Sequence, residues 1–276
     1  MRNKKIQLII LEVLGVLLGL LYISPFYIII INSFKSKKEF LLNTLSWPNE
    51  LLLDNYLKAM DKMGFLTAFK NSLIVTVLSL LLIVILSSMA AWMLARTKSK
   101  LSNVIFYSFV AAMLIPFQSV MLPLVDLFGV NKLNLINTHF GIIFMYVGFG
   151  ASLSVFLFHG FVKSVPISLE EAATIDGCNK LQLYWKIVFP LLKSISVTVA
   201  ILNGMWIWND FLLPSLVLQK KELRTLPLST KYFFGAYQAD WTLAMAGLVL
   251  AIIPIIIFYL LAQKQIIKGV LAGSIK

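Results

Sequence analysis

The sequence predicts an all-α fold, a polytopic membrane bundle of six transmembrane helices. Of its 276 residues, 59% are hydrophobic and only 13% are charged, and the mean hydropathy is +0.88. These values lie outside the range of soluble domains. The apolar runs are also long and unbroken, whereas strands of a membrane barrel would alternate over about ten residues. We therefore expect residues 1–276 to form a single transmembrane domain built from helices.

Spanning the hydrocarbon core of a membrane takes roughly 20 apolar residues of helix. By this measure hydropathy places six spans, at residues 8–31, 68–94, 104–127, 140–161, 191–213 and 242–262. The first follows the basic start MRNKK and is too long for the apolar core of a signal peptide, so it is expected to stay as a helix. Pro116 and Pro123 fall inside the third span and Pro254 inside the sixth, and each favours a kink.

The distribution of Lys and Arg sets the expected orientation. An even number of spans places both termini on one side, which carries 13 of the 24 cations. Arg96, Lys98 and Lys100 crowd into the short second connection, and cations in short loops mark the cytoplasmic side. The chain is thus expected in the plasma (inner) membrane as a multi-pass protein, with both termini and the loop 162–190 cytoplasmic.

The residue patterns of several function classes do not occur in this sequence. The net charge of +12 is spread in short clusters between apolar runs, which is typical of membrane flanks and not of a nucleic-acid surface. A single cysteine, Cys178, excludes an internal disulfide and a cysteine-based metal cluster. Neither a phosphate-binding loop of the G-x-x-x-x-G-K-[ST] type nor an H-E-x-x-H zinc motif occurs. We therefore expect no metal, no catalytic residues and no cofactor in this chain.

Ionisable residues are rare within the predicted spans. A proton-driven secondary carrier usually needs intramembrane carboxylates or histidines, together with inverted repeats. Only Asp210 is a candidate, and helical rise places it near the outer headgroups, where solvation at the interface and a place in an outer cavity are both open. A membrane enzyme would need a catalytic cluster at one depth, and the sequence shows none.

The stretch NGMWIWNDFLLP is a candidate substrate cavity, because aromatic faces beside amide and carboxylate groups suit a sugar. The candidate residues are Asn203, Met205, Trp206, Asn209 and Asp210. Tryptophan at a membrane interface is equally typical of an aromatic belt, which is favoured for Trp208, while Asn203 and Met205 lie deeper and favour a cavity.

The stretch SLEEAATIDG, residues 168–177, predicts a short helix outside the membrane. Ser168 and Glu171 have the spacing of a capping box, Glu170 adds negative charge at the helix start, and Gly177 offers a stop. The expected helix spans residues 169–176 and is too short to be stable unless it packs on something. Spacing alone leaves open whether that is the membrane surface or a partner protein. A second short helix is expected over 180–188.

The same stretch resembles the signature of the permease family of ATP-binding-cassette importers, E-A-A, three residues, G, nine residues, I-x-L-P. The matching positions are Glu171, Ala172, Ala173, Gly177, Ile187 and Pro190, with Phe189 in place of the usual Leu. Asp176, the WNDFLLP stretch, TLPL at 225–228 and the C-terminal residues extend the likeness. Together they resemble the carbohydrate-uptake branch, specifically its shorter, six-helix, maltose-permease-type subunit.

The resemblance implies the transmembrane fold of type I importers, with 168–177 as the coupling helix that docks into an ATPase subunit. The ATPase-coupling residues would then be Glu170, Glu171, Ala172, Ala173, Asp176, Gly177, Ile187 and Pro190, with Glu171 the main contact. The C-terminal tail, about 264–276, can reach the ATPase in this subfamily. Implied partners are a second homologous permease in a heterodimer, two ATPase subunits that hold ATP and Mg, an external solute-binding protein, and membrane lipid, with no nucleic acid.

The implied function is translocation of a sugar, an oligosaccharide, by alternating access. Two alternatives stay open. One is a secondary carrier, and the other is a permease of the same family for a non-sugar solute such as a glycerol-phosphate or a modified sugar.

Overall fold

The computed structural model describes residues 2–235 and 239–274, with side chains over 7–235 and 239–263. Within these ranges the regular structure is helical, apart from one isolated bridge between Phe234 and Ala239. The chain forms two compact units, one of residues 1–66 and 229–254 and one of residues 67–228 and 255–276. The first is called the outer-loop unit and the second the bundle unit, and each is described by itself.

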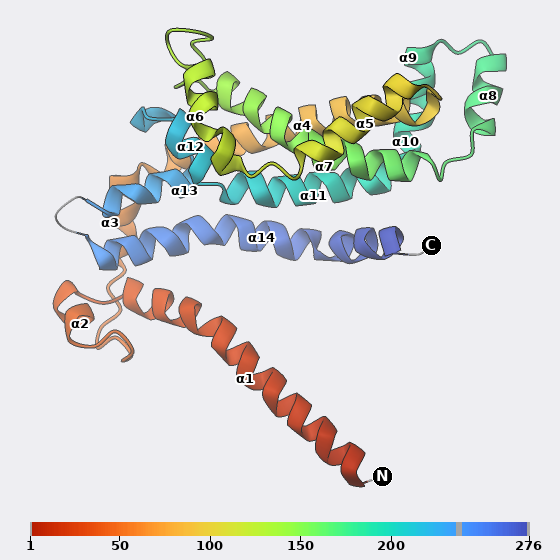
Figure 1. The fold of residues 1–276 in the computed structure, drawn as a ribbon. Helices are drawn as coiled ribbons and strands as arrows, with labels where there is room; N and C mark the ends of the chain where they lie inside the picture. Colours follow the sequence, from red (N-terminus) through yellow and green to blue (C-terminus); the bar gives the residue numbers. More distant parts are fainter. Residues whose placement is uncertain (1, 236–238, 275–276) are drawn as a thin grey trace. The chain divides into compact units, whose positions relative to one another are not determined.

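The bundle unit holds most of the helices (Figure 1). Its elements are α4 (Phe65–Arg96, whose first two residues belong to the other unit), α5 (Lys100–Ala112), α6 (Phe117–Phe128), α7 (His139–Val162), α8 (Ser168–Ile175), α9 (Lys180–Leu183), η1 (Tyr184–Val188), α10 (Phe189–Leu191), α11 (Lys193–Asn209), α12 (Leu212–Val217), η2 (Lys221–Leu223), α13 (Leu226–Ser229) and the later part of α14 (Trp241–Ser274).

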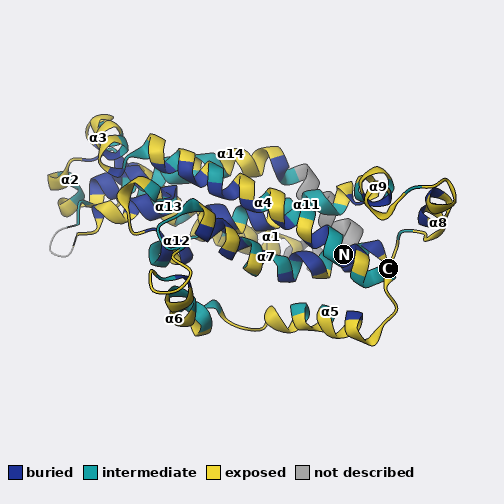
Figure 2. Cartoon of the chain, turned by 90° about the horizontal axis from the view of Figure 1, so that it is seen from above, coloured by how far each residue is buried: buried dark blue, intermediate teal, exposed yellow. Residues whose placement is uncertain are grey.

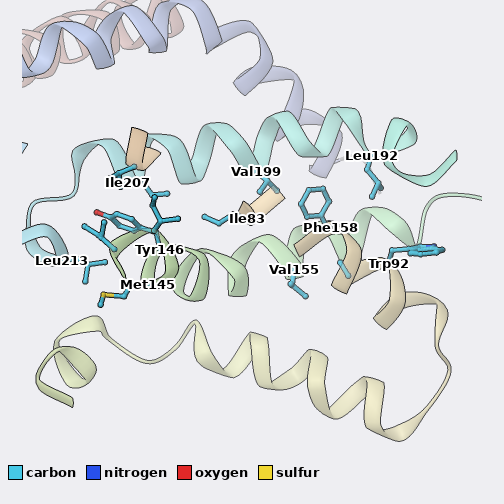
Figure 3. Close-up of a cluster of buried hydrophobic side chains, with 14 of the residues drawn as sticks. Ile83, Trp92, Met145, Tyr146, Val155, Phe158, Leu192, Val199, Ile207 and Leu213 are labelled. Carbon is cyan, nitrogen blue, oxygen red and sulfur yellow. The ribbon is translucent and has the colours of Figure 1, made fainter. Parts of the chain in front are cut away.

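The core of the bundle unit lies where α4, α7 and α11 pack together, and Figure 3 shows their buried side chains. In lipid, helices associate through close packing and interhelical hydrogen bonds, because the tails around them are as apolar as the side chains. Gly150 of α7 permits this close approach, since an added Cβ atom would lie 2.6 Å from Cδ1 of Ile83 and 2.8 Å from Oδ1 of Asn203. Asn203 of α11 also donates through Nδ2 to Oγ of Ser154, at 3.0 Å.

The third predicted span is not one helix. Helices α5 and α6 cover it, but they are bent by 104° across a break. Pro116 is the N-terminal cap of α6, with φ −67° and ψ 138°, whereas Pro123 stays inside α6. Because a proline lacks the N–H group and disfavours helical geometry in the residue before it, a clean break replaces the expected kink.

The fifth predicted span is also altered. The segments Lys180–Leu191 and Lys193–Asn209 are bent by 75°, and α11 ends at Asn209, four residues before the predicted end at 213. Asp210 has extended geometry, with φ −70° and ψ 128°. The expected helix over 180–188 is present as α9 followed by the π-helical turn η1.

Helices cover the other four predicted ranges: α1 (Arg2–Ser33), α4, α7 and α14. Each is long and apolar enough to cross a membrane, and the described residues contain four such helices, or up to six if each bent pair counts as one span. Pro254 stays within α14.

The outer-loop unit contains α1, α2 (Lys37–Leu42), α3 (Asp54–Met63), η3 (Thr230–Phe233) and the first part of α14. Its connecting segment after α1 folds around Lys35, which is fully buried and donates through Nζ to the carbonyl oxygen of Asn43 at 2.9 Å. Asn55 of α3 donates through Nδ2 to the carbonyl oxygens of Ser33 and Lys35. This connecting segment is therefore held by buried polar contacts.

Gly141 in α7 generates a test of this packing. A Cβ atom built there would lie 2.1 Å from the backbone oxygen of Leu135, which cannot rotate away as a side chain could. We expect Gly141→Ala to lower the free energy of unfolding of the purified protein by about 1–3 kcal/mol. The measurement is the midpoint temperature of thermal denaturation in detergent, which should fall. Gly160→Ala in the same helix is the matched control, because nothing lies within 4 Å of its Cβ position. Equal midpoints for both variants would contradict the close approach.

Candidate functional site

Helix α8, residues Ser168–Ile175, begins on the backbone and not on a side-chain cap. Ile167 already has helical geometry, with φ −65° and ψ −26°, and no side-chain cap bond is present. Its carbonyl oxygen accepts from the N–H groups of Glu170 and Glu171, at 2.9 and 3.0 Å. The predicted capping box is wrong, because a cap residue must be extended and Ser168 lies one residue inside the helix.

The other end of α8 has the predicted stop. Gly177 has φ +86°, in the left-handed region that favours glycine. Its N–H donates to the carbonyl oxygen of Thr174 at 3.1 Å, and the N–H of Cys178 donates to that of Ala173 at 3.0 Å. This pair of bonds is a Schellman motif, which satisfies carbonyl groups that the helix end leaves free.

A capping box does occur nearby, at the start of α9. Asn179 accepts from the N–H of Gln182 at 2.9 Å, and the Gln182 side chain accepts from the N–H of Asn179 at 3.0 Å. Sequence reasoning missed it, although the Asn-x-x-Gln spacing was its signal. Two neighbouring short helices thus end and begin at defined residues, which fixes their relative direction.

Glu170 anchors α8 to the bundle. Its carboxylate accepts through Oε1 from Nε of Arg96 at 2.8 Å and through Oε2 from Nε1 of Trp92 at 2.9 Å, and Arg96 Nη2 lies 2.7 Å from Oε1. The Glu170 side chain is 8% exposed and that of Arg96 is 18% exposed. Removing either partner would leave a charge with little water to replace it, at a cost of about 3–5 kcal/mol for a buried pair.

The contacts to α4 continue along one face of that helix. Arg96 Nη2 also donates to the carbonyl oxygen of Val165 at 2.9 Å, and Ser88 Oγ lies 2.7 Å from the hydroxyl oxygen of Tyr184. The Trp92 ring packs on the Tyr184 ring, with centroids 5.8 Å apart. Residues 88, 92 and 96 follow one another at four-residue spacing, so they lie on the same side of α4.

The opposite side of α8 is exposed, as Figure 2 shows for most of this helix. Glu171 and Ala172 are exposed, and Ile175 is 86% exposed. Among the residues predicted for coupling, Glu170 and Ala173 are buried. Four others have different surroundings: Asp176 and Gly177 are exposed after the helix, Ile187 is half-buried in η1, and Pro190 is exposed in α10.

The predicted tail contact at 264–276 lies outside the residues whose side chains are described.

A cavity of about 590 Å³ lies in the bundle unit between the α5–α6 break, α7 and α11. Its walls are mostly apolar, and Gly148 and Gly150 of α7 line it without side chains. Asn203 and Ser152 contribute polar groups, and Trp206 contributes an aromatic ring. Pockets of this kind, mostly apolar with a few polar groups, are typical of small-molecule sites.

Of the five residues predicted for a substrate cavity, Asn203 and Trp206 line this one, and Met205, Asn209 and Asp210 do not. Asn209 is exposed and donates to the carbonyl oxygen of Met205 at 2.7 Å. Asp210 instead closes the end of α11, where it accepts from the hydroxyl of Tyr146 at 3.0 Å and from the N–H of Leu212 at 2.9 Å. Tyr146 in turn packs edge-on against Trp206, with centroids 5.5 Å apart.

The expectation of an aromatic belt for Trp208 is wrong. This side chain is only 9% exposed, and its ring packs edge-on against Phe69 of α4, with centroids 5.8 Å apart. Trp206, two residues earlier, is the exposed one, at 42%. A shift of two positions turns a helix by about 200°, so one ring faces α4 and the other faces away.

The helices long and apolar enough to cross a membrane, the cavity beside α7 and α11, and the short helix α8 fastened to α4 are the features of a multi-pass membrane transport component. Residues 83–271 match the model of one family, the binding-protein-dependent transport system inner membrane components. The chain belongs to this family, which is one of transport permeases.

Relatives that cover the whole chain are also transport permeases. The chain is 52% identical over 276 residues to the "Probable starch degradation products transport system permease protein AmyC" of Thermoanaerobacterium thermosulfurigenes, covering 100% of both chains. It is 33% identical to the "Melibiose/raffinose/stachyose import permease protein MelC" of Bacillus subtilis (strain 168), covering 100% of this chain and 98% of that one.

The fold has solved counterparts. A chain from the crystal structure of a bacterial ABC transporter involved in the import of the acidic polysaccharide alginate superposes with a TM-score of 0.81. It is 24% identical and the match covers 96% of this chain and 98% of that chain. A second alginate transporter structure, in complex with a periplasmic protein that holds an alginate pentasaccharide, matches with a TM-score of 0.68 and 17% identity over 95% and 96% of the two chains. These likenesses show the importer transmembrane fold.

Proposed function

We propose that this chain is the permease subunit of an ATP-binding-cassette importer that brings an oligosaccharide across the plasma membrane by alternating access. The observation that carries the proposal is α8, a short helix outside the long ones, with one side fastened to the bundle and the other side exposed. A partner that binds the exposed side of such a helix and displaces it would also displace the bundle to which the other side is attached. The sugar substrate is supported by the relatives, whose names specify starch degradation products and melibiose, raffinose and stachyose.

In this proposal the chemistry of ATP belongs to partner chains. Two ATPase subunits hold ATP and Mg, and their closure moves α8, with Glu171 as the main contact and Ala172 and Ile175 beside it. Ala172 has a small side chain, so a partner surface can approach the helix backbone closely. The chain itself supplies no cofactor. A second, homologous permease completes a heterodimer, and a solute-binding protein delivers the sugar from outside.

The orientation that fits this role places both termini and α8 in the cytoplasm. It is supported by the cations Arg96 at the end of α4, Lys98 in the connection and Lys100 at the start of α5, because short cytoplasmic loops are rich in Lys and Arg. Arg96 lies in direct contact with α8, so α8 and this basic connection share one side.

The cavity beside α7 and α11 is the proposed path for the sugar. Trp206 offers a ring face on which a sugar ring can stack, and Asn203 and Ser152 offer hydrogen-bonding groups. Tyr146 and Asp210 hold the Trp206 end of this wall through a ring contact and a hydrogen bond.

The two alternative functions, a secondary carrier and a permease for a non-sugar solute, would require different structural features. A secondary carrier would transport without ATP, and nothing in its mechanism would need an exposed helix such as α8. A permease for a glycerol-phosphate or another anionic solute would need cations in its cavity, whereas the lining residues of this cavity are uncharged.

The substrate class is testable in a reconstituted system. With the second permease, the ATPases and the cognate binding protein in proteoliposomes, we expect sugar-loaded binding protein to stimulate ATP hydrolysis, because the loaded form signals outward opening. The measurement is phosphate release with and without a panel of oligosaccharides. Stimulation by amino-acid or glycerol-phosphate ligands instead would reject the sugar proposal, and sugar uptake without ATP would favour a secondary carrier.

Glu171→Ala should lower ATP-dependent sugar uptake by more than about tenfold. The reason is that loss of a charged group at a protein interface weakens binding between the two proteins by a factor of this size or more. The bundle should stay folded, because Glu171 is exposed. Uptake of labelled sugar into proteoliposomes measures the effect, and Glu50→Ala, an exposed carboxylate in the outer-loop unit, is the control. Uptake at the unmutated rate with ATPases still bound would rule out the contact.

The orientation can be tested by thiol labelling. In a Cys178→Ser background, Ile175→Cys places the only thiol at a position that is 86% exposed. A membrane-impermeant maleimide should label it in inside-out vesicles and not in intact cells, and bound ATPase should protect it. Trp47→Cys, at an exposed position of the outer-loop unit, should label from the outside. The reverse pattern would invert the topology.

A further inference from the structure

We propose that Arg96 and Trp92 of α4 are positioning residues of transport, through which the movement of α8 reaches α4 by way of Glu170. This inference rests on the proposed function. It assigns a route for the motion inside the permease, from the exposed side of α8 to α4, whose Arg96 lies 74 residues before Glu170 in the chain.

The contact between Glu170 and α4 is directional. Both carboxylate oxygens are occupied, Oε1 by the Arg96 guanidinium and Oε2 by Nε1 of Trp92. Charge-assisted bonds of this kind are stronger than neutral ones, and the planar guanidinium fixes their geometry. A displacement of α8 along or across α4 would break bonds at two donors at once, so α4 is forced to follow.

The Arg96 side chain also holds the chain ahead of α8. Its Nη2 lies 2.7 Å from Oε1 of Glu170 and donates to the carbonyl oxygen of Val165 at 2.9 Å. One guanidinium therefore contacts the connection from α7 and the first turn of α8 together. This prevents α8 from swinging on its own connection, which would otherwise absorb a push without moving the bundle.

The segment after α8 is fastened to the same side of α4. Tyr184 in η1 contacts Ser88 Oγ at 2.7 Å through its hydroxyl and packs on Trp92 with its ring. The three α4 positions 88, 92 and 96 cover about 12 Å of helix at 1.5 Å per residue. Residues before, within and after α8 thus attach to one stripe of α4, and the stripe moves with all three.

The burial of the pair favours a positioning role over a role in stability alone. Side-chain exposures of 8% and 18% leave little water to compete with the bonds or to replace them during a movement. A buried ion pair contributes little to net stability, because the desolvation of both charges offsets their attraction. Its benefit lies in geometry, which an apolar contact of the same size would not fix.

The test compares coupling and not activity alone. Arg96→Gln, Glu170→Gln and Trp92→Phe would be assembled with the partner permease, ATPases and binding protein in proteoliposomes. The readout is the number of sugar molecules taken up per ATP hydrolysed. We expect this ratio to fall by about tenfold for Arg96→Gln and Glu170→Gln and by less for Trp92→Phe, which loses the Nε1 donor and the fused ring but keeps an aromatic side chain.

Matched variants separate the route from general damage. Lys98→Gln removes an exposed cation two residues after Arg96, in the connection that follows α4, and should keep the unmutated ratio. Arg96→Lys keeps the charge without the planar fork and should give an intermediate ratio. The double variant Arg96→Gln with Glu170→Gln should be no worse than either single one, because both remove the same contact.

Two outcomes would overturn the inference. One is an unmutated ratio in assembled Glu170→Gln and Trp92→Phe complexes, and the other is a parallel loss of uptake and hydrolysis, which indicates failed docking of α8. Failure of the proposed function looks different, because the unmutated complex itself would then show no hydrolysis that depends on sugar and binding protein.

Discussion

The ion pair between Glu170 and Arg96 is the contact on which the α8–α9 part of the bundle unit depends. Helix α8 has eight residues, too few to be stable alone, and its N-terminus lacks a side-chain cap. What holds it is the buried carboxylate on one side, the Schellman turn at Gly177, and the capped start of α9. With these three in place, the remaining side of the helix is free to face a partner while its direction relative to α4 stays fixed.

Breaks in two helical segments shape the cavity beside α7 and α11. A lipid-facing helix cannot leave backbone groups unpaired, so a break is tolerated only where protein or a cavity satisfies the freed groups. The break at Pro116 opens one wall of the cavity, and the end of α11 at Asp210 is closed by the hydroxyl of Tyr146 and the N–H of Leu212. Asn203 lies in the cavity wall and also joins α11 to α7 through Ser154. Asn203, a polar group of the cavity wall, is therefore also part of the helix packing.

The sequence was sufficient for the helical membrane fold, because long apolar runs have no other solution in lipid, and for the stop at Gly177, because its left-handed geometry is a local property. It was not sufficient for the direction of neighbouring side chains. Glu170 and Glu171 look equivalent in a string of letters, and only the position of Arg96 on another helix decides that Glu170 is buried. Likewise, Trp206 and Trp208 both suit a membrane interface, and contact with Phe69 buries the second.

The two adjacent glutamates explain why α8 can be both anchored and exposed. Successive residues on a helix point about 100° apart, so a pair of acidic residues places one carboxylate toward the bundle and the next toward solvent. An apolar residue at position 170 could bury as much area, but apolar packing is not directional and would let the helix slide along α4. The carboxylate, bound by a planar guanidinium and an indole N–H, permits one orientation only. For the proposed role of α8 in transmitting movement, this restriction matters more than added stability, because a contact that slides would not move α4.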